Sequence, residues 1–432
     1  MSKRHRPMAA SPRSQRGAAI VLIAIALLAL LLMAGLALDG GHLMLNKTRL
    51  QNAVDAAALA GAKTLDETGN TGSATTQALQ AFANNANSSG NRELATAYAS
   101  GSGPISITVQ YSATLPPFTA GSPTGPYIRV TAVGFNLPTT LVRLAGISQT
   151  SVTATAVAGP SPKINNACNI SPMLVCGDST AGAANLWGYT VNAPTVLKAS
   201  APGNSSEVGP GNFQLIQLGG TGANIVRNNL AGGYSGCTTT GNTVTTETGN
   251  EAGPTAQGMN TRFGDYSGPM NGTQSQYPPD VIVRAQSPAL TVQTSGTTNT
   301  IMQGSTPITT ANINLLYSYQ NYQTDLQNPA KYNYQPAENG GQGATLGAFQ
   351  RRIVAVPVGS CTGTGTGSTS VPVLGFACFF LLQPVVQKGT DAYVLGQFIG
   401  KCDVNGTPGP SPGAGPSPYI IQLYRDPGSG DS

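Results

Sequence analysis

Apolar residues follow three different patterns along this 432-residue chain. Residues 18–38 form one continuous apolar run without a charged side chain. From residue 42 to 65 apolar and small residues recur at helical spacing, and from residue 104 onward apolar residues alternate with polar ones. Such patterns are typical of a membrane span, a helix with one apolar face, and half-buried strands. They predict an α+β protein in which the helices come first.

The continuous run is long enough to cross a bilayer. About twenty apolar residues span the ~30 Å of hydrocarbon as a helix, and this run has twenty-one between Arg16 and Asp39. The alternatives are a cleavable signal, whose apolar region is shorter, and a buried core helix, which usually keeps a polar face. We therefore predict an uncleaved transmembrane helix over 17–38. The basic residues of the tail, 1–16, place the amino terminus in the cytoplasm.

Beyond the run, an alanine-rich helix is expected to continue from His42 to Leu65, where no proline occurs. Small residues four positions apart stack along one side of a helix and allow another helix to approach closely. This stripe predicts an interface with a partner helix or a second copy of the chain. Packing within the chain's own domain is the alternative. The residues of the stripe are Leu43, Leu50, Ala53, Val54, Ala57 and Gly61.

The alternating region predicts an antiparallel sheet after a second helix at 74–86. Helix followed by sheet is the order of a pilin-like α+β domain, which we expect over 39–158. A Gly-Pro-Ser-Pro sequence at 159–162 predicts a linker. The strands are expected around 105–109, 128–132 and 152–156, with a short apolar turn or helix at 141–144.

The remainder, residues 159–432, is rich in glycine, threonine and asparagine and predicts a mostly β exported domain with long loops. Its densest apolar run, 371–386, is too short and too interrupted to span a membrane and predicts a buried pair of strands. Residues 406–418 read as a Pro/Gly loop. Other strand-like pieces lie at 213–218, 281–283, 314–319, 353–358 and 419–423.

Charge is scarce and unevenly placed. Only 9% of residues are charged, and five basic residues in the first sixteen account for the whole formal net charge of +5. A nucleic-acid-binding protein needs a basic face on its folded part, which this sequence lacks. The 40% hydrophobic content also excludes disorder driven by charge.

All cysteines lie beyond the apolar run. An even number in an exported region predicts disulfides, and six cysteines allow fifteen pairings. Cys168 and Cys176 enclose a short loop and could pair with each other. Zinc is the alternative, but no Cys-x-x-Cys spacing and no nearby histidine support it. The six are Cys168, Cys176, Cys237, Cys361, Cys378 and Cys402.

The amino-terminal residues carry a family resemblance. Arg16-Gly17-Ala18, the apolar run, Leu38-Asp39-Gly40-Gly41 and the helix sequence RLQNAVDAAALAGA at 49–62 resemble the TadE/TadG-like family. These are bacterial inner-membrane proteins of tight-adherence (Flp) pilus assembly. The remainder is similar, less diagnostically, to the carboxy-terminal portions of TadG-type members. The resemblance implies a structural role in the periplasm through contacts with other pilus-assembly proteins.

Two features depart from related patterns. Prepilins carry a glutamate five residues after the glycine at which they are processed, whereas Leu22 stands there in this chain. Some TadG-type members have a metal-binding DxSxS motif, and the nearest sequence here, Asp178-Ser179-Thr180, lacks that spacing. We therefore expect neither prepilin cleavage nor a metal site.

Catalytic chemistry is not indicated. The two histidines, His5 and His42, lie in the tail and next to the apolar run, which excludes a histidine-dependent triad in the exported part. No phosphate-binding loop, nucleophile elbow or zinc-protease motif occurs. A hydrolase with two carboxylates stays open, since acids are present; pairing with arginines is the alternative for them. The acids are Glu247, Glu251, Asp265 and Asp280, and the arginines Arg262, Arg284, Arg351 and Arg352.

A group of tyrosines is the other unusual feature. Exposed tyrosines favour binding, so a surface adhesin for a glycan or host surface is the alternative to pilus assembly. Cross-strand packing with wet hydroxyls is the plainer interpretation. We expect a protein that binds and does not catalyse, without a cofactor. The tyrosines are Tyr317, Tyr319, Tyr322, Tyr332 and Tyr334.

Overall fold

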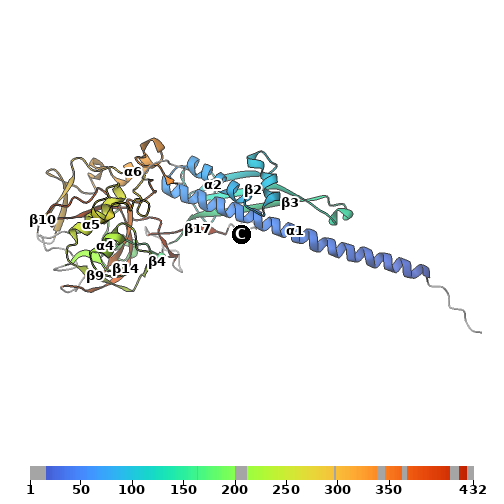
Figure 1. The fold of residues 1–432 in the computed structure, drawn as a ribbon, viewed down its shortest axis with the longest axis horizontal. Helices are drawn as coiled ribbons and strands as arrows, with labels where there is room; N and C mark the ends of the chain where they lie inside the picture. Colours follow the sequence, from blue (N-terminus) through green and yellow to red (C-terminus); the bar gives the residue numbers. More distant parts are fainter. Residues whose placement is uncertain are drawn as a thin grey trace, which may run out of the picture.

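The computed structural model describes residues 16–162, 164–199, 212–295, 298–337, 346–361, 367–408 and 418–425. Within them the molecule is elongated: a long helix carries a small α+β domain on its second half and a larger, strand-rich domain at its far end (Figure 1). The predicted α+β class with the helix first is confirmed. The basic tail lies outside the described residues.

Helix α1 (Arg16–Thr68) is unbroken over 53 residues, about 80 Å at 1.5 Å per residue. The predicted apolar run and the predicted alanine-rich helix are therefore one element. Gly40 and Gly41, which glycine's low helix propensity marks as a weak point, lie inside it without a break. The apolar run and the folded part are therefore connected by one continuous helix.

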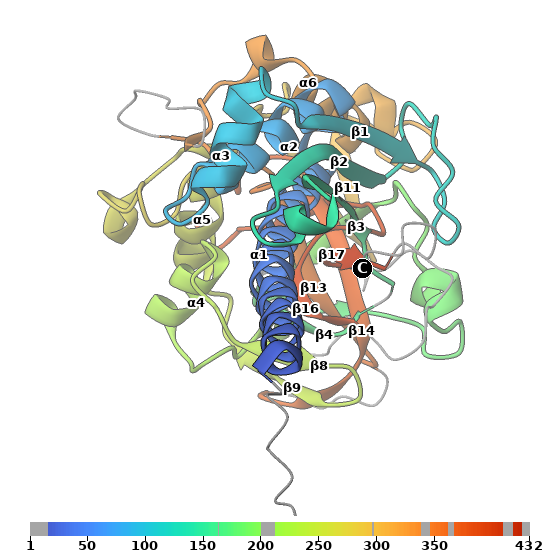
Figure 2. The same ribbon diagram turned by 90° about the vertical axis from the view of Figure 1, so that its right-hand side faces the viewer.

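The first domain packs α1 and α2 on an antiparallel sheet of order β1-β2-β3-β17 (Figure 2). The predicted second helix and three strands are confirmed. Its core is small and apolar, with Phe82 from α2 and Ile128 and Val130 from β2 fully buried. Its elements are α2 (Thr71–Ala86), α3 (Arg92–Tyr98), β1 (Ser106–Ser112), β2 (Tyr127–Pro138), the short helix η2 (Val142–Ala145), β3 (Gln149–Pro160) and β17 (Ile421–Tyr424).

The predicted linker at 159–162 is wrong in its first half. Strand β3 runs to Pro160, and Gly159 and Pro160 pair with Gln422 and Ile421 of β17. A Cβ at position 159 would lie 2.4 Å from the Tyr127 ring, so the glycine makes room for a side chain instead of supplying flexibility. The boundary predicted at 158/159 is also incomplete, because β17, far along the chain, returns to the first domain's sheet.

The second domain is built on a sheet of order β5-β13-β14-β15-β6, whose central strand is buried on both faces. Phe376 and Phe380 of β14 face one apolar cluster, while Ala377 and Phe379 face the other. Its elements are β4 (Ile164–Cys168), β5 (Val175–Cys176), β6 (Pro194–Lys198), β7 (Asn212–Ile216), α4 (Ala223–Leu230), β8 (Cys237–Thr239), β9 (Thr243–Thr248), α5 (Ala252–Asn260), β10 (Leu290–Ser295), β11 (Thr298–Gln303), β12 (Thr306–Pro307), α6 (Tyr319–Leu326), β13 (Ile353–Gly359), β14 (Ser370–Leu381), β15 (Val394–Phe398) and β16 (Asn405–Pro408).

Four expectations for this domain are corrected. The run 371–386 is not a strand pair, because β14 continues without a turn to Leu381. The strand-like piece at 314–319 ends in a helix, since Ser318 and Asn321 form a capping box that starts α6. Residues 281–283 form no strand. Of the loop expected at 406–418, residues 406–408 belong to β16, and 409–417 lie outside the described residues.

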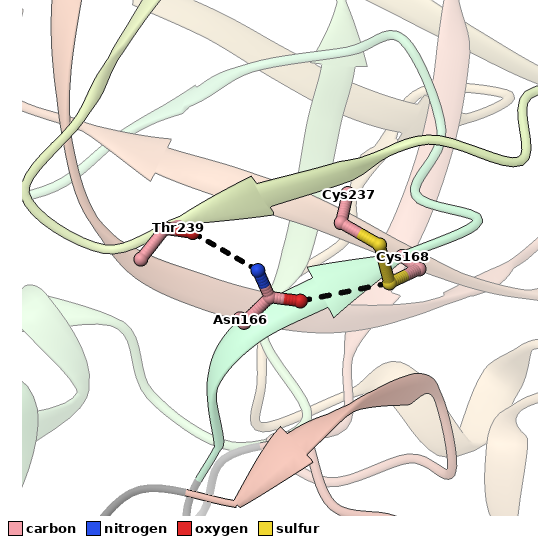
Figure 3. Close-up of a disulfide and its surroundings, with 4 residues drawn as sticks. All are labelled: Asn166, Cys168, Cys237 and Thr239. Atoms are coloured by element: carbon pink, nitrogen blue, oxygen red, sulfur yellow. Dashed lines mark hydrogen bonds between the residues drawn. A yellow bond between two sulfur atoms is a disulfide. The ribbon is translucent and has the colours of Figure 1, made fainter.

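The cysteines form three disulfides, Cys168–Cys237, Cys176–Cys361 and Cys378–Cys402. The pairing of Cys168 with Cys176 is wrong. Cys168 lies opposite Cys237 in the register of β4 and β8, where Asn166 and Thr239 also bond across the strands (Figure 3). Cys176 lies opposite Gly359 at the end of β13, two residues from Cys361. Strand pairing, and not sequence proximity, determines the partners.

The packing of α1 predicts that Ala57→Leu destabilises the chain. Ala57 is fully buried under the sheet, and extra methylenes in a packed core cost about 1–3 kcal/mol. The matched control is Asn52→Leu, which adds the same side chain to an exposed position of the same helix. Denaturant unfolding of the full chain in detergent measures both. Equal stability of the two variants would contradict the packing.

The disulfides predict unequal losses of stability. Removing Cys176–Cys361, whose cysteines are 185 residues apart, should lower the free energy of unfolding by about 5 kcal/mol in the chain-entropy account. Removing Cys378–Cys402, with a separation of 24, should cost about 3 kcal/mol. Paired Cys→Ser variants compared by denaturant unfolding test this order. A larger loss for the shorter loop would refute it.

Candidate functional site

The first half of α1 is a long apolar surface. Among the described residues α1 is the one helix long and apolar enough to cross a membrane. Its large side chains are mostly exposed from Ile20 to Leu38, with Leu36 71% exposed. Soluble monomers rarely expose contiguous apolar patches beyond a few hundred Å². The exposure therefore indicates that something apolar covers this half.

The tip of the β2–β3 hairpin reaches this apolar half of α1. Leu141, in the connection between the strands, lies so close to Gly35 that a Cβ at position 35 would be 2.6 Å from its own. Gly35 is buried, while Leu36 and the residues just before Gly35 are exposed. A side chain at position 35 would push the hairpin tip off the helix, so the glycine permits the contact.

Asp39, at the end of the apolar run, holds the hairpin tip by three hydrogen bonds. Its carboxylate accepts the backbone N–H groups of Thr140 at 3.0 Å, Leu141 at 2.9 Å and Val142 at 2.8 Å. These are unpaired donors at the start of η2, which a carboxylate satisfies well. The hydrogen bonds, above all that from Val142, lower the pKa of Asp39. The acid is therefore a structural cap that joins the helix to the sheet.

A second polar contact lies one turn further along α1. Glu93 of α3 accepts hydrogen bonds from the His42 ring at 2.7 Å and from the Asn46 amide at 2.8 Å. Desolvation alone would raise the pKa of Glu93, but the hydrogen bonds from His42 and Asn46 outweigh it and lower that pKa. The only histidine of the described residues thus acts as a donor between helices.

The predicted interface stripe is inside the first domain. Leu50, Ala53, Val54 and Ala57 are fully buried, and Leu43 packs against the same core. At Gly61 a Cβ would meet Ile128 at 2.6 Å and Ala78 at 3.0 Å. The chain's own sheet and α2 therefore occupy the side that we expected a partner to use. The interface prediction is wrong for these residues, and packing within the domain is what the structure has.

The far end of α1 is joined to the second domain by polar contacts. The Lys63 ammonium lies 2.5 Å from the Asp403 carboxylate. Asp66 accepts hydrogen bonds from the Tyr419 hydroxyl and the Gln350 amide. Burial raises the pKa of Asp66. Together with β17, these contacts fix the second domain against the helix end.

A cleft of about 1120 Å³ opens between the two domains. It is lined by the end of α1, the β1–β2 connection, α6 and β17, and five tyrosines are among its lining residues: Tyr127, Tyr319, Tyr322, Tyr419 and Tyr424. Hydroxyls among them are already engaged: that of Tyr322 with Asp280, that of Tyr419 with Asp66 and that of Tyr424 with the Pro160 carbonyl at 2.5 Å. The cleft can take a ligand, but these contacts organise the domain junction first.

Most of the predicted tyrosine cluster packs inward. Tyr322 is fully buried and donates to Asp280, Tyr317 donates to Asp325 at 3.0 Å, and Tyr332 donates to the Leu326 carbonyl. The Tyr319 ring packs at a tilt against Phe380 and lines the cleft. Tyr334 lies beside Gly264. The five do not form one exposed face, which favours the packing interpretation.

Of the four candidate carboxylates, Glu247 alone lies within a described strand or helix, and the other three lie outside such elements. Asp280 is fully buried, accepts the backbone N–H groups of Ile282 and Arg352, and has its pKa raised by burial. Glu247 lies in β9, where it accepts the Gly222 N–H at 3.2 Å, and Glu251 precedes α5. Among the described residues no group of three or more His, Cys, Asp or Glu could hold a metal ion.

The arginines are likewise used inside the second domain. Arg352 is fully buried and donates to the Leu381 carbonyl at 2.8 Å, while its guanidinium lies over the Phe380 ring. Arg262 donates to the Leu230 carbonyl and Arg351 to that of Pro278. Arg284 lies 3.5 Å from Asp325. Among the expected pairings of these arginines with acids, Arg352 and Asp280 are joined by a hydrogen bond from the Arg352 backbone N–H to the Asp280 carboxylate.

Comparison with known proteins gives one match. Residues 17–64 match the model of the family described as putative Flp pilus-assembly TadE/G-like. No curated protein and no solved structure matches the chain. The matched segment covers the apolar half of α1, Gly35, Asp39 and the buried stripe. The resemblance inferred from residues 16–62 is thus confirmed at family level and supports a role in pilus assembly.

Asp39→Ala is expected to speed hydrogen exchange at the backbone amides of residues 140–142, because these N–H groups lose their acceptor. Exchange of the full chain in detergent, read by mass spectrometry, measures this. Asp178→Ala is the control, since Asp178 bonds Thr180 in another loop.

The same amides predict a pH dependence. The pKa of Asp39 lies below its ordinary value of 3.8, so protection should be present above that value and be lost as pH falls through the lowered pKa. Exchange at residues 140–142 that stays unchanged in Asp39→Ala, or protection that persists after the Asp39 carboxylate is protonated, would contradict the role of Asp39 as a cap.

Proposed function

We propose that this chain is a membrane-anchored structural component of Flp-type pilus assembly, of the TadG type, which acts by binding other proteins and catalyses no reaction. The observation that carries the proposal is the division of α1. Its first half is apolar and exposed, its second half is buried in a folded domain, and the family match spans both.

The proposed topology has the amino terminus in the cytoplasm and both domains in the periplasm. Five basic residues precede the apolar run, and basic flanks stay on the cytoplasmic side. Three disulfides in the second domain support an oxidising compartment on the other side. Partners are then other pilus-assembly proteins that contact the folded part or the apolar half of α1.

The scattered carboxylates support a role without turnover. A retaining or inverting hydrolase needs two carboxyl groups held across one bond, whereas Asp280 and Glu247 accept hydrogen bonds from backbone N–H groups. The junction between domains is likewise built from hydrogen bonds that hold elements together. These contacts hold the two domains rigidly, so the chain can present a binding surface to a partner in a fixed position.

A surface adhesin is the second candidate, and the tyrosine-lined cleft is the observation in its favour. It requires the second domain to reach the cell exterior. An impermeant protease added to intact cells separates the two candidates: digestion of the second domain favours the adhesin, and protection favours the periplasmic component.

The anchor is tested by complementation of a strain that lacks this chain. A variant in which a cleavable secretory signal replaces residues 1–38 should be exported but fail to restore pili, because its domains are released from the membrane. The matched control replaces residues 18–38 with an unrelated uncleaved apolar span of equal length that keeps glycine at position 35. Electron microscopy counts pili, and immunoblotting checks abundance. Full piliation with the released form would overturn the anchoring role, and normal piliation in the deletion strain would overturn the pilus role.

A further inference from the structure

The connection between β2 and β3, residues 139–148, is a closed and well-defined tip. The Thr139 N–H donates to the Ser148 carbonyl at 3.2 Å, and the Thr139 hydroxyl donates to the Ile147 carbonyl. Gly146, at a positive φ of 88°, ends η2 and donates to the Arg143 carbonyl. With Asp39 capping the other end of η2, the tip is held in one conformation at a fixed position on α1.

The tip extends to a level inside the apolar run. Leu141 contacts Gly35, three residues before the run ends at Leu38. At 1.5 Å per residue along the helix, that contact lies about 4.5 Å inside the end of the run. Figure 1 shows the β2–β3 hairpin extending along α1 toward its apolar half. If α1 spans a bilayer, the tip is placed at the boundary between hydrocarbon and headgroups.

The chemistry of the tip suits that boundary. Ile147 is 50% exposed, and Leu141 and Val142 are half-buried against α1. Arg143 is exposed, and residues 139–148 contain no acid. Apolar side chains beside a basic one are typical of segments that lie in the interface, with the cation among lipid phosphates.

We propose that residues 139–148 insert into the headgroup and upper acyl region of the bilayer that α1 crosses. Ile147 and Val142 enter the apolar edge, and Arg143 contacts lipid phosphates. The inference rests on the proposed anchor. Lipid is the favoured occupant because the tip is continuous with the apolar half of α1 through Leu141. Because the first domain is packed rigidly on α1, a second attachment beside the helix restricts the tilt of helix and domain relative to the membrane plane.

The test uses the full chain in vesicles that contain lipids brominated near the start of the acyl chain, which quench nearby tryptophan. Ile147→Trp reports on the tip. Ala120→Trp is the matched control, because the β1–β2 connection is at the other end of β2, roughly 40 Å away for twelve strand residues. Leu36→Trp reports insertion of α1. The native Trp187 is 4% exposed in the second domain and gives a constant background.

Strong quenching at Leu36→Trp, clear quenching at Ile147→Trp and none at Ala120→Trp is the expected result. Quenching at Leu36→Trp without any at Ile147→Trp leaves the tip in water or on a protein, and overturns the interfacial tip while the anchor stands. No quenching at Leu36→Trp overturns the anchor and the tip together. Circular dichroism of each variant excludes misfolding as the cause.

Discussion

Close packing between one side of α1 and the antiparallel sheet determines where every other part of the molecule lies. Ala53 and Ala57 are fully buried on this side, and at Gly61 the Ile128 side chain fills the space that a larger residue would need. Dispersion between such surfaces is individually weak and collectively large, and it is lost quickly when a gap opens. The apolar half of α1 is therefore rigidly aligned with the first domain.

Polar contacts then fix the position of the helix along the sheet. Asp39 bonds the hairpin tip, Glu93 receives His42 and Asn46, and Asp66 receives Tyr419. Exposed ion pairs contribute little stability by themselves. The polar contacts matter here for position, because apolar packing alone would allow the alanine-rich surface of α1 to slide along the sheet. Three sets of directional bonds at separate levels remove that freedom.

Local patterns in the sequence predicted much of the fold, and pairing between distant segments could not be read from it. The apolar run, the helix over 74–86 and the alternating strands depend on neighbouring residues, so their periodicity was informative. The stripe at Ala53, Ala57 and Gly61 was recognised as a close-packing surface, but its partner was not. Small residues indicate that a neighbouring element packs closely. They do not indicate whether that element belongs to the same chain or to a partner.

The remaining errors have the same origin. The acid Asp39 was visible at the end of the run, yet its acceptor role depends on amides about a hundred residues away. The partner of Cys168 depends on the register of β4 against β8, which a loop-length argument ignores. The Gly-Pro-Ser-Pro sequence has the composition of a linker, and β17 pairs with its first half all the same.

The return of β17 to the first domain makes the larger domain a loop within the smaller one. Its chain leaves through β3 and comes back through β17, the strand next to β3 in the sheet. A load applied to the larger domain therefore divides between two adjacent strands, and pulling both together shears their ladders against the rest of the sheet instead of peeling a single end. The same topology delays completion of the sheet during folding, since its edge at β3 stays open until residues 421–424 have been synthesised.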